Sequence, residues 1–289
     1  MTAKPAPLSA LDLGEVTVTF VPDGEIRVDP RMAYPRGHEP IHADGLPVTD
    51  EDGMLLLSVG SILVTNGEHR TLIDVGIGDR TIPLPRRSPA QRDAYMRGGD
   101  LLDNLARLNL DPDDIDTVLI THLHADHIGW ITREQDGQCT FGRAIYWVSD
   151  PEWEFWNRPE NADKLTGPRR QELQTIADAK HILTDGASAA PGITAVATSG
   201  HTPGHFGFHI TGTARQAFVI GDAAHCPAEV LRPDLSWAGD LDPDAAIQIR
   251  RQLTDMLPAP NAVLIGPHFP DPVFRQLEQT ASTLRPVTW

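Results

Sequence analysis

The sequence predicts one α/β domain over residues 1–289, in which each half runs strands first and helices after. Three observations lead to this prediction. Apolar runs of strand length occur in both halves, residues with helical spacing follow them, and no composition break separates the halves as a linker would. A chain of 289 residues suits one large α/β domain or two average ones, and the missing linker favours one.

Strands and loops dominate the N-terminal third of the chain. Residues 16–21 are predicted to form a strand and the stretch through Pro47 a loop, so residues 1–50 form a strand and loop extension. Asn66-Gly67-Glu68 lies between two apolar runs and predicts a β-hairpin. Residues 79–99 are rich in Pro, Gly and Arg and predict a long loop.

Helices become frequent after this loop. Leu101, Leu105 and Leu108 recur at helical spacing, and a buried strand follows at residues 117–120. Asp242 precedes Pro243 and predicts the N-cap of a later helix. The remaining predicted elements are helices at residues 151–157, 168–181, 243–257 and from 271 onward, and strands at residues 193–197, 206–210, 217–221 and 262–265.

Charge and composition exclude several classes of partner. The 40 acidic residues outnumber the 24 basic ones, and the formal charge of −16 repels phosphate backbones and anionic lipids, so we expect neither nucleic acid nor membrane as a partner. Two cysteines cannot form a disulfide framework, and the N-terminus lacks the apolar segment of a Sec signal peptide. These features predict a cytoplasmic protein.

The sequence His122-x-His124-x-Asp126-His127 directly follows the strand predicted at residues 117–120. Four side chains that can bind a metal lie within six residues, and they cannot all be buried without partners. Imidazole and carboxylate are ligands for zinc-like ions. A histidine-rich surface loop is the alternative, but the flanking residues on both sides are apolar, which favours a metal site.

Three more candidate ligands follow later predicted strands. His201, Asp222 and His268 each come directly after an apolar run. An isolated histidine at a strand end is more often a hydrogen-bonded structural residue. The same position, directly after an apolar strand, recurs for all of these residues and favours a shared site. In α/β scaffolds, strand ends deliver functional side chains to one edge of a sheet.

These residues resemble the metallo-β-lactamase superfamily, and the resemblance covers roughly residues 55–270. It implies a four-layer αββα sandwich with the site at one edge between the sheets. It also implies two divalent metal ions, with Zn²⁺ expected and Mn²⁺ or Fe²⁺ as alternatives. One ion would take His122, His124 and His201, the other would take Asp126, His127 and His268, and Asp222 would bridge them.

Other residues receive supporting roles from this resemblance. Asp74 matches a strand-end Asp that orients a ligand imidazole, with a turn-capping Asp as the alternative. His205 is interpreted as a structural hydrogen-bonding residue and Cys226 as a small buried residue. The residues expected to lie at the surface or in packing are His38, His42, His69, His181 and His209.

Asp222 and His225 indicate the branch of the superfamily. True β-lactamases lack the bridging Asp, and glyoxalase-II-like thioesterases add a C-terminal basic patch that we do not find. Acyl-homoserine-lactone lactonases carry a Tyr three residues after that Asp, where this chain has His225. A His at this position resembles the branch that contains methyl parathion hydrolase.

The resemblance implies a dinuclear metal-dependent hydrolase, in which a metal-bridging hydroxide attacks a neutral ester, lactone or phosphotriester. Asp126 would protonate the leaving group, and His225, as a neutral imidazole, would donate a hydrogen bond to the substrate. The alternative is a non-hydrolytic or thioester-cleaving metal enzyme of secondary metabolism. The expected partner is a small, neutral and apolar molecule, and a homodimer remains open.

Two features are expected to shape the substrate pocket. Residues 30–50 and 80–99 are predicted to flank the site entrance, because the scaffold itself supplies only the metals. Trp130, Trp153 and Trp156 could form an aromatic wall, which would suit an apolar substrate. The alternative, that these three residues belong to the core, has equal standing.

Overall fold

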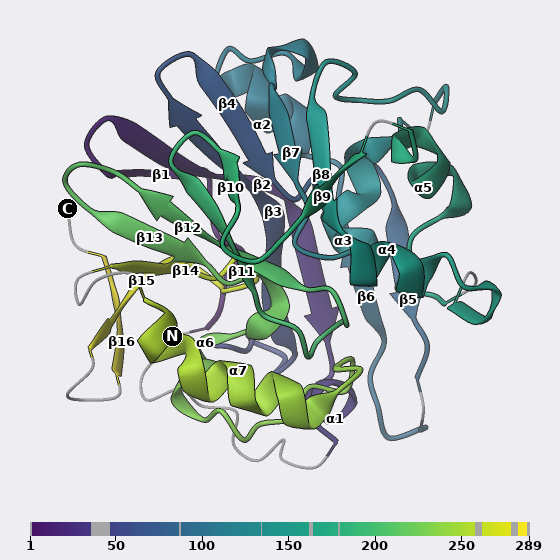
Figure 1. The fold of residues 1–289 in the computed structure, drawn as a ribbon. Coiled ribbons are helices and arrows are strands. Elements are labelled where there is room, and N and C mark those ends of the chain that lie inside the picture. The colour runs from purple at the N-terminus through teal and green to yellow at the C-terminus, as the bar shows by residue number, and fades with distance from the viewer. Residues whose placement is uncertain are drawn as a thin grey trace.

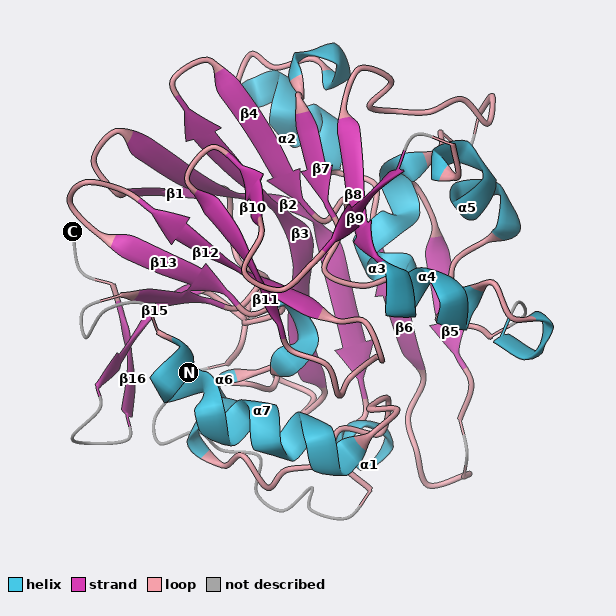
Figure 2. Cartoon of the chain, in the orientation of Figure 1, coloured by secondary structure: helices cyan, strands magenta, loops and turns pink. Residues whose placement is uncertain are grey.

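The computed structural model describes residues 2–35, 47–86, 88–133, 135–161, 164–178, 180–257, 262–278 and 283–287. Two mixed β-sheets lie face to face, and helices cover their outer faces (Figure 1). Figure 2 shows the same arrangement with helices and strands coloured separately. The layers are therefore those of the predicted αββα sandwich.

The first sheet has the strand order β5-β6-β2-β3-β4-β7-β8-β9, and β1 pairs with β2. Its central strands are long, antiparallel and N-terminal, whereas β4, β7, β8 and β9 are parallel to one another. The bounds are β1 Ser9–Asp12, β2 Val16–Val28, β3 Leu55–Asn66, β4 His69–Ile73, β5 Thr81–Leu84, β6 Ala94–Arg97, β7 Thr117–Leu119, β8 Ile145–Ser149 and β9 Lys180–Leu183.

The second sheet runs in chain order from β10 to β16, and its pairs are antiparallel except for β13 with β14. Its bounds are β10 Ser188–Ala190, β11 Ile193–Ala197, β12 Phe206–Thr211, β13 Gln216–Val219, β14 Val263–Ile265, β15 Phe274–Glu278 and β16 Thr283–Pro286. The helices are α1 Pro30–Ala33, α2 Leu101–Arg107, α3 Ala125–Ile128, α4 Asp150–Trp156, α5 Arg170–Ile176, α6 Pro227–Leu231 and α7 Pro243–Met256.

Apolar side chains fill the space between the layers. Phe20 and Ile62 of the first sheet join Phe208 and Ile210 of the second in one buried cluster, which holds the sheets together. Nearly all of β3 is buried, because a central strand covered on both faces has no solvent side. Burial of this kind stabilises the fold by about 25 cal/mol per Å² of apolar surface.

The outer helices bury their apolar faces on the sheets. Leu101 and Leu105 of α2 pack with Val118 of β7, so this helix covers the first sheet. Leu253 of α7 packs with Phe218 of β13 and covers the second sheet. No helix of the described segments is long and apolar enough to cross a lipid bilayer.

Most predicted elements are confirmed. Strands β11, β12, β13 and β14 and helices α2, α4 and α7 lie where the sequence placed them. The turn between β3 and β4 has Gly67 at φ +60°, a conformation that glycine adopts without strain. The side chain of Asp242 accepts a hydrogen bond from Ala245 N at 3.0 Å, as an N-cap does.

The predicted loop at residues 79–99 is wrong, because β5 and β6 form an antiparallel hairpin there. The strand β6 pairs with β2 through Ile26 and Met96, which makes the hairpin an extension of the first sheet. The prolines misled the prediction. Pro83 lies on the edge strand β5, where a missing N–H costs no ladder hydrogen bond.

The C-terminal helix predicted from residue 271 is also wrong. Residues there form β15 and β16, and Phe274 pairs with Ile265 of β14, so sheet pairing overrides the local helical pattern. The helix predicted at residues 168–181 ends at Ile176, and β9 begins at Lys180. The strand β8 was not predicted.

The N-terminal extension is described only in part. The short helix α1 lies inside the segment that was predicted to be a loop. His38 and His42, with the rest of residues 36–46, lie outside the described residues. The prediction of one domain over residues 1–289 stays a prediction.

Candidate metal centre

The candidate site lies where strands of both sheets end. The segment from His122 to His127 follows β7 and continues into α3, while His201 follows β11. Asp222 lies in a short 3-10 turn after β13, and His268 follows β14. The fold thus brings together side chains from four strand ends, as the sequence predicted.

Two groups of donor atoms converge at this edge. In each group, one donor atom per residue lies within 4.8 Å of all the others, and every member is buried. We call them the first donor group and the second donor group. The first contains His122, His124, His201 and Asp222, and the second contains Asp126, His127 and His268.

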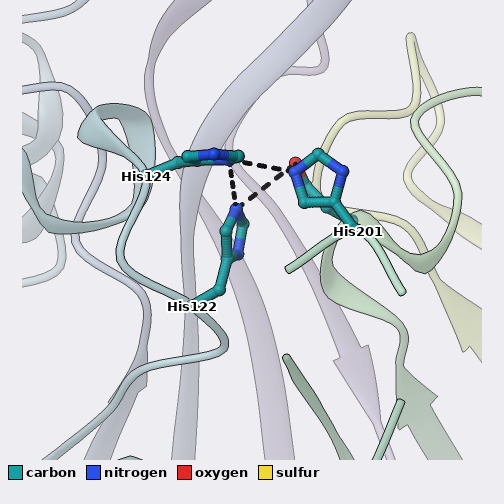
Figure 3. A group of neighbouring side chains, drawn as sticks. His122, His124 and His201 are labelled. Carbon is teal, nitrogen blue, oxygen red and sulfur yellow. Dashed lines mark hydrogen bonds and ion pairs between the residues drawn. The ribbon is translucent and has the colours of Figure 1, made fainter. Parts of the chain in front are cut away.

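The three imidazoles of the first donor group point at one another (Figure 3). Nδ1 of His124 lies 2.9 Å from Nε2 of His122 and 2.9 Å from Nε2 of His201. The second donor group is similar, with Nε2 of His268 lying 3.2 Å from Nε2 of His127. Ring nitrogens this close cannot all donate to one another.

Asp222 stands between the two groups. Its Oδ2 lies 3.6 Å from Nε2 of His122 and 3.3 Å from Nε2 of His201. Its Oδ1 lies 3.2 Å from Nε2 of His127 and 3.0 Å from Nε2 of His268. Each carboxylate oxygen therefore faces a different donor group.

Acceptors outside the site fix three of the rings. Nδ1 of His127 lies 2.8 Å from Oδ2 of Asp74, and Nδ1 of His201 lies 3.0 Å from Oδ1 of Asp240. Nδ1 of His268 lies 2.7 Å from the main-chain oxygen of Ser58. Because these acceptors face Nδ1, the Nε2 atom of each of the three rings points inward to the donor groups.

The electrostatics of the site fit a cation. Burial, the largest cause, holds the pKa of His122 and His124 well below the usual range and lowers that of His201 to about 3, so these rings are neutral. Oδ1 of Asp222 is buried and has no hydrogen-bond donor among the described residues. Inward lone pairs beside an unpartnered carboxylate oxygen form a donor set of the kind that divalent ions take.

Asp74 lies where the predicted orienting role would place it. Besides facing His127, its side chain accepts hydrogen bonds from N and Oγ1 of Thr121, each at 2.8 Å. Asp74 adopts φ +58°, a left-handed conformation that costs about 1 kcal/mol or more for a residue with a Cβ. The surrounding hydrogen bonds hold this strained residue behind the ring that it orients.

His225 lies beside the site but outside both donor groups. Its Nε2 is 3.2 Å from Oδ2 of Asp222, and its Nδ1 is 3.2 Å from Oε2 of Glu229. The ring stacks on Trp237, with centroids 4.1 Å apart and an interplanar angle of 16°.

The protonation of His225 differs from the expected neutral imidazole. Burial opposes the charge, but the carboxylates of Glu229 and Asp222 outweigh it and raise the pKa of His225 to about 10. Since Nδ1 faces Glu229, a neutral ring would keep its proton there and could not donate from Nε2. An imidazolium, in contrast, carries a second proton on Nε2, which faces Asp222 and the site.

His205 and Cys226 also behave as predicted. His205 accepts a hydrogen bond from Asp222 N at Nε2, 2.9 Å away, and its Nδ1 lies 2.7 Å from Oγ1 of Thr198. It thus supports the main chain of Asp222. Cys226 is fully buried, with its Sγ 3.5 Å from the hydroxyl of Tyr34.

Sequence reasoning missed four residues around the site: Glu152, Glu229, Asp240 and Trp237. Glu229 could have been found, because it follows His225 by one helical turn after Pro227 starts a helix. Asp240 and Trp237 lie in an irregular segment with no motif. Nothing local in the sequence indicates that they reach His201 and His225.

A pocket of about 100 Å³ opens onto the donor groups. Ile26, Leu84, Met96 and Trp237 form its apolar wall, and no Lys or Arg is among its described lining residues. Two of the four, Leu84 and Met96, belong to the segment that was predicted to flank the entrance.

The three tryptophans considered from the sequence do not line this pocket. Trp130 donates its indole N–H to Asp23 at 2.7 Å, and Trp156 is buried with its ring beside His124. The ring of Trp153 is covered by Nζ of Lys180, 4.2 Å from its centroid. The core interpretation therefore holds for Trp130 and Trp156, which are buried, whereas Trp153 is partly buried. Trp153 and Trp156 line a separate pocket of about 430 Å³.

The solved structure of AidC, a dizinc quorum-quenching lactonase in complex with a product, is similar to this chain over 98% of both chains, with 22% identity and a TM-score of 0.79. The sequence model of the metallo-beta-lactamase superfamily matches residues 56–136, which include the histidine motif. The chain has the metallo-β-lactamase fold. The segment that this family model matches includes four of the seven donor residues, His122, His124, Asp126 and His127.

Two further solved structures resemble this chain about as closely as AidC does. The hydrolase AbOPH is 24% identical, with 99% of both chains covered and a TM-score of 0.77. A probable metal-dependent hydrolase from Staphylococcus aureus is 21% identical, with 96% of this chain and 100% of that chain covered and a TM-score of 0.77.

A probable metallo-hydrolase of Methanocaldococcus jannaschii is 26% identical over 132 residues, or 46% of this chain. The match spans 48% of that protein, about half of its length. None of these likenesses tests the methyl parathion hydrolase branch, which stays a prediction.

Proposed function

We propose that this chain is a dinuclear metal-dependent hydrolase of neutral, apolar esters or lactones. The observation that carries the proposal is the position of Asp222, whose two oxygens face two different donor groups. A carboxylate in this position can bridge two cations. The solved structure of AidC is described as a dizinc lactonase, which supports the same arrangement here.

The described residues assign each ion a set of donors. His122, His124 and His201 would hold one ion and Asp126, His127 and His268 the other, with Asp222 shared. Zinc is the expected metal, because the donors are imidazole nitrogens and carboxylate oxygens, and Mn²⁺ or Fe²⁺ would also suit them. Two such ions would supply a hydroxide nucleophile at neutral pH and polarise the acceptor oxygen of the substrate.

Asp126 and His225 are the proposed catalytic residues, and both line the pocket. Nε2 of His225, fixed by Glu229 behind it, would donate a hydrogen bond to the oxygen on which negative charge develops. The Asp126 carboxylate would carry a proton to the leaving oxygen.

The pocket wall supports the proposed substrate class. An apolar wall without Lys or Arg would leave a charged acyl chain unpaired, so it favours a neutral substrate. Thioesters of glutathione carry carboxylates and suit this wall poorly. Several structures with this fold are lactonases in complex with acyl-homoserine products, which makes lactones the first substrates to try.

The test is a substrate screen on the zinc-loaded protein. Acyl-homoserine lactones of several chain lengths, an aryl ester, a neutral phosphotriester and an acyl-glutathione thioester would be compared. We expect turnover of the lactones or the aryl ester, loss of that turnover with a chelator and recovery with zinc. A zinc-loaded, folded protein that hydrolyses only the thioester, only the phosphotriester, or none of the four classes would overturn the proposal.

A further inference from the structure

The helix α4 touches both loops that carry the histidines of the first donor group. Its residue Glu152 is fully buried. Oε1 of Glu152 accepts a hydrogen bond from Leu123 N at 3.0 Å, and Oε2 accepts one from Gly204 N at 3.1 Å. Leu123 lies between His122 and His124, and Gly204 follows His201 by three residues, so one carboxylate joins the two loops.

The contact between α4 and the second of these loops is close. Ser149 Oγ, at the N-cap of α4, donates to the main-chain oxygen of Gly204 at 2.6 Å. A Cβ on residue 204 would lie 2.2 Å from that Oγ and 2.3 Å from Glu152 N, which explains glycine there. The loop of His201 is therefore held against α4 at both its N–H and its carbonyl group.

Glu152 also fixes an aromatic ring beside the site. Its Oε1 accepts the indole N–H of Trp156 at 2.7 Å. The Trp156 ring meets the His124 ring edge-on, with centroids 5.4 Å apart and an interplanar angle of 71°. The position of this indole depends on the same carboxylate that holds the two loops.

His124 needs such packing more than the other rings do. The Nδ1 atoms of His127 and His201 face carboxylates, and that of His268 faces a main-chain oxygen. In His124 the Nδ1 atom faces the site instead, and the described residues provide no acceptor for its Nε2. Packing against Trp156, from outside the donor group, therefore contributes to its orientation.

The hydrogen-bond donors to Glu152 are uncharged, and no Lys or Arg of the described segments forms a salt bridge with it. An ion pair therefore does not account for burying this carboxylate. Three hydrogen bonds that converge from two loops and one ring account for it better, because each fixes a group next to a donor of the first group.

We propose that Glu152 is a positioning residue that sets the distance between the His122–His124 loop and the His201 loop and, through Trp156, the orientation of His124. The inference rests on the proposed metal centre. It assigns Glu152 to the first donor group and predicts no direct effect on the second.

The test uses Glu152→Gln and cobalt as the probe. The amide of Gln presents one N–H₂ group where the carboxylate accepts, so at least one of the three hydrogen bonds is lost. Visible absorption of bound Co²⁺ and competition with a chelator report the geometry and affinity of each ion. We expect an altered Co²⁺ spectrum and an affinity about 10- to 100-fold lower for one ion, with the other unchanged.

Asp23→Asn is the matched control. Asp23 is also fully buried and also accepts one indole N–H, from Trp130, together with main-chain N–H groups such as Ile77 N, but it contacts neither histidine loop of the first donor group. We expect this variant to lose stability and to keep the wild-type Co²⁺ spectrum. An altered spectrum in the control would assign the effect to general loosening and overturn the proposal.

Trp156→Phe is the second variant, for the case in which Glu152→Gln does not fold. It removes the indole donor, keeps an aromatic ring beside His124 and should shift the Co²⁺ spectrum less than Glu152→Gln. Wild-type affinity and spectrum in both variants would overturn the role of Glu152. A wild-type protein that binds no Co²⁺ would instead overturn the proposed metal centre, so the two failures are distinguishable.

Discussion

Oδ1 of Asp240 lies 3.0 Å from Nδ1 of His201, and the other oxygen of Asp240 receives Nη1 of Arg250 at 3.3 Å. Arg250 is fully buried and also donates to Leu235 O at 2.7 Å. The helix α7, which supplies Arg250, is thereby connected to the first donor group through one carboxylate. In the second donor group, Oδ2 of Asp74 likewise lies 2.8 Å from Nδ1 of His127.

Asp240→Asn should therefore weaken metal binding at the first donor group by about 10- to 100-fold. The amide keeps the size of the side chain but holds the imidazole proton less strongly, so His201 becomes a poorer donor. Competition titration with a chelator measures the change, and excess zinc should restore activity. Unchanged zinc affinity would show that His201 is oriented by packing alone.

Asp222→Ala should remove the connection between the two ions, because its oxygens face both donor groups. We expect elemental analysis to give close to two equivalents in the wild type and a lower value in this variant, with little activity. His122→Ala should lose one ion outright. Two tightly bound ions in Asp222→Ala would contradict a bridging role.

His225→Ala tests whether this ring acts on the substrate. If its Nε2 donates to developing charge, the variant keeps both ions and loses about 10²- to 10³-fold in kcat/KM. Metal content is measured beside the rate. Loss of metal, with activity returning in excess zinc, would instead show that His225 serves to orient Asp222.

Metal removal should strongly destabilise the fold. Six buried carboxylates surround the site, and only Asp240 among them pairs with a Lys or Arg of the described residues. Ions held at a large excess over their Kd stabilise a protein by about 4 kcal/mol each, so chelation should lower Tm by about 10 °C or more. Calorimetry with and without chelator measures this, and an unchanged Tm would contradict stabilisation of the fold by bound ions. The six are Asp74, Asp126, Glu152, Asp222, Glu229 and Asp240.

The two cysteines should differ in reactivity toward iodoacetamide. Burial raises the pKa of the Cys226 thiol to about 12, so the reactive thiolate is nearly absent at pH 8 and increases only as pH approaches that value. Cys139 is partly exposed. Mass spectrometry of the native protein at pH 8 should find label on Cys139 alone, and unfolded protein should be labelled at both. Fast labelling of native Cys226 would contradict its burial.

The donor groups could be predicted from the sequence because each member follows an apolar strand, and the fold only has to align strand ends. His122 and Asp222 are examples. Asp240 and Glu152 could not be predicted in this way. Asp240 lies in an irregular segment, and Glu152 looks like an ordinary surface residue of a helix until α4 is packed against two loops. Their roles depend on tertiary contacts that no local pattern records.

The same reasoning explains the errors in the fold. Prolines within residues 81–97 suggested a loop, but an edge strand tolerates a residue without an N–H group. The C-terminal segment has a weak helical pattern, but its pairing with β14 decides its structure. Both errors lie at the edges of the sheets, where pairing with a neighbour outweighs local preference.

The hairpin of β5 and β6 contributes Leu84 and Met96 to the pocket, and it contributes none of the seven donors. It also lies at the margin of the first sheet, where β6 pairs with β2. Under the proposed function, the hairpin would shape what the pocket admits, while other stretches of the chain would hold the metals. Changes to a few hairpin side chains would then alter which substrates fit the pocket and leave the two donor groups intact.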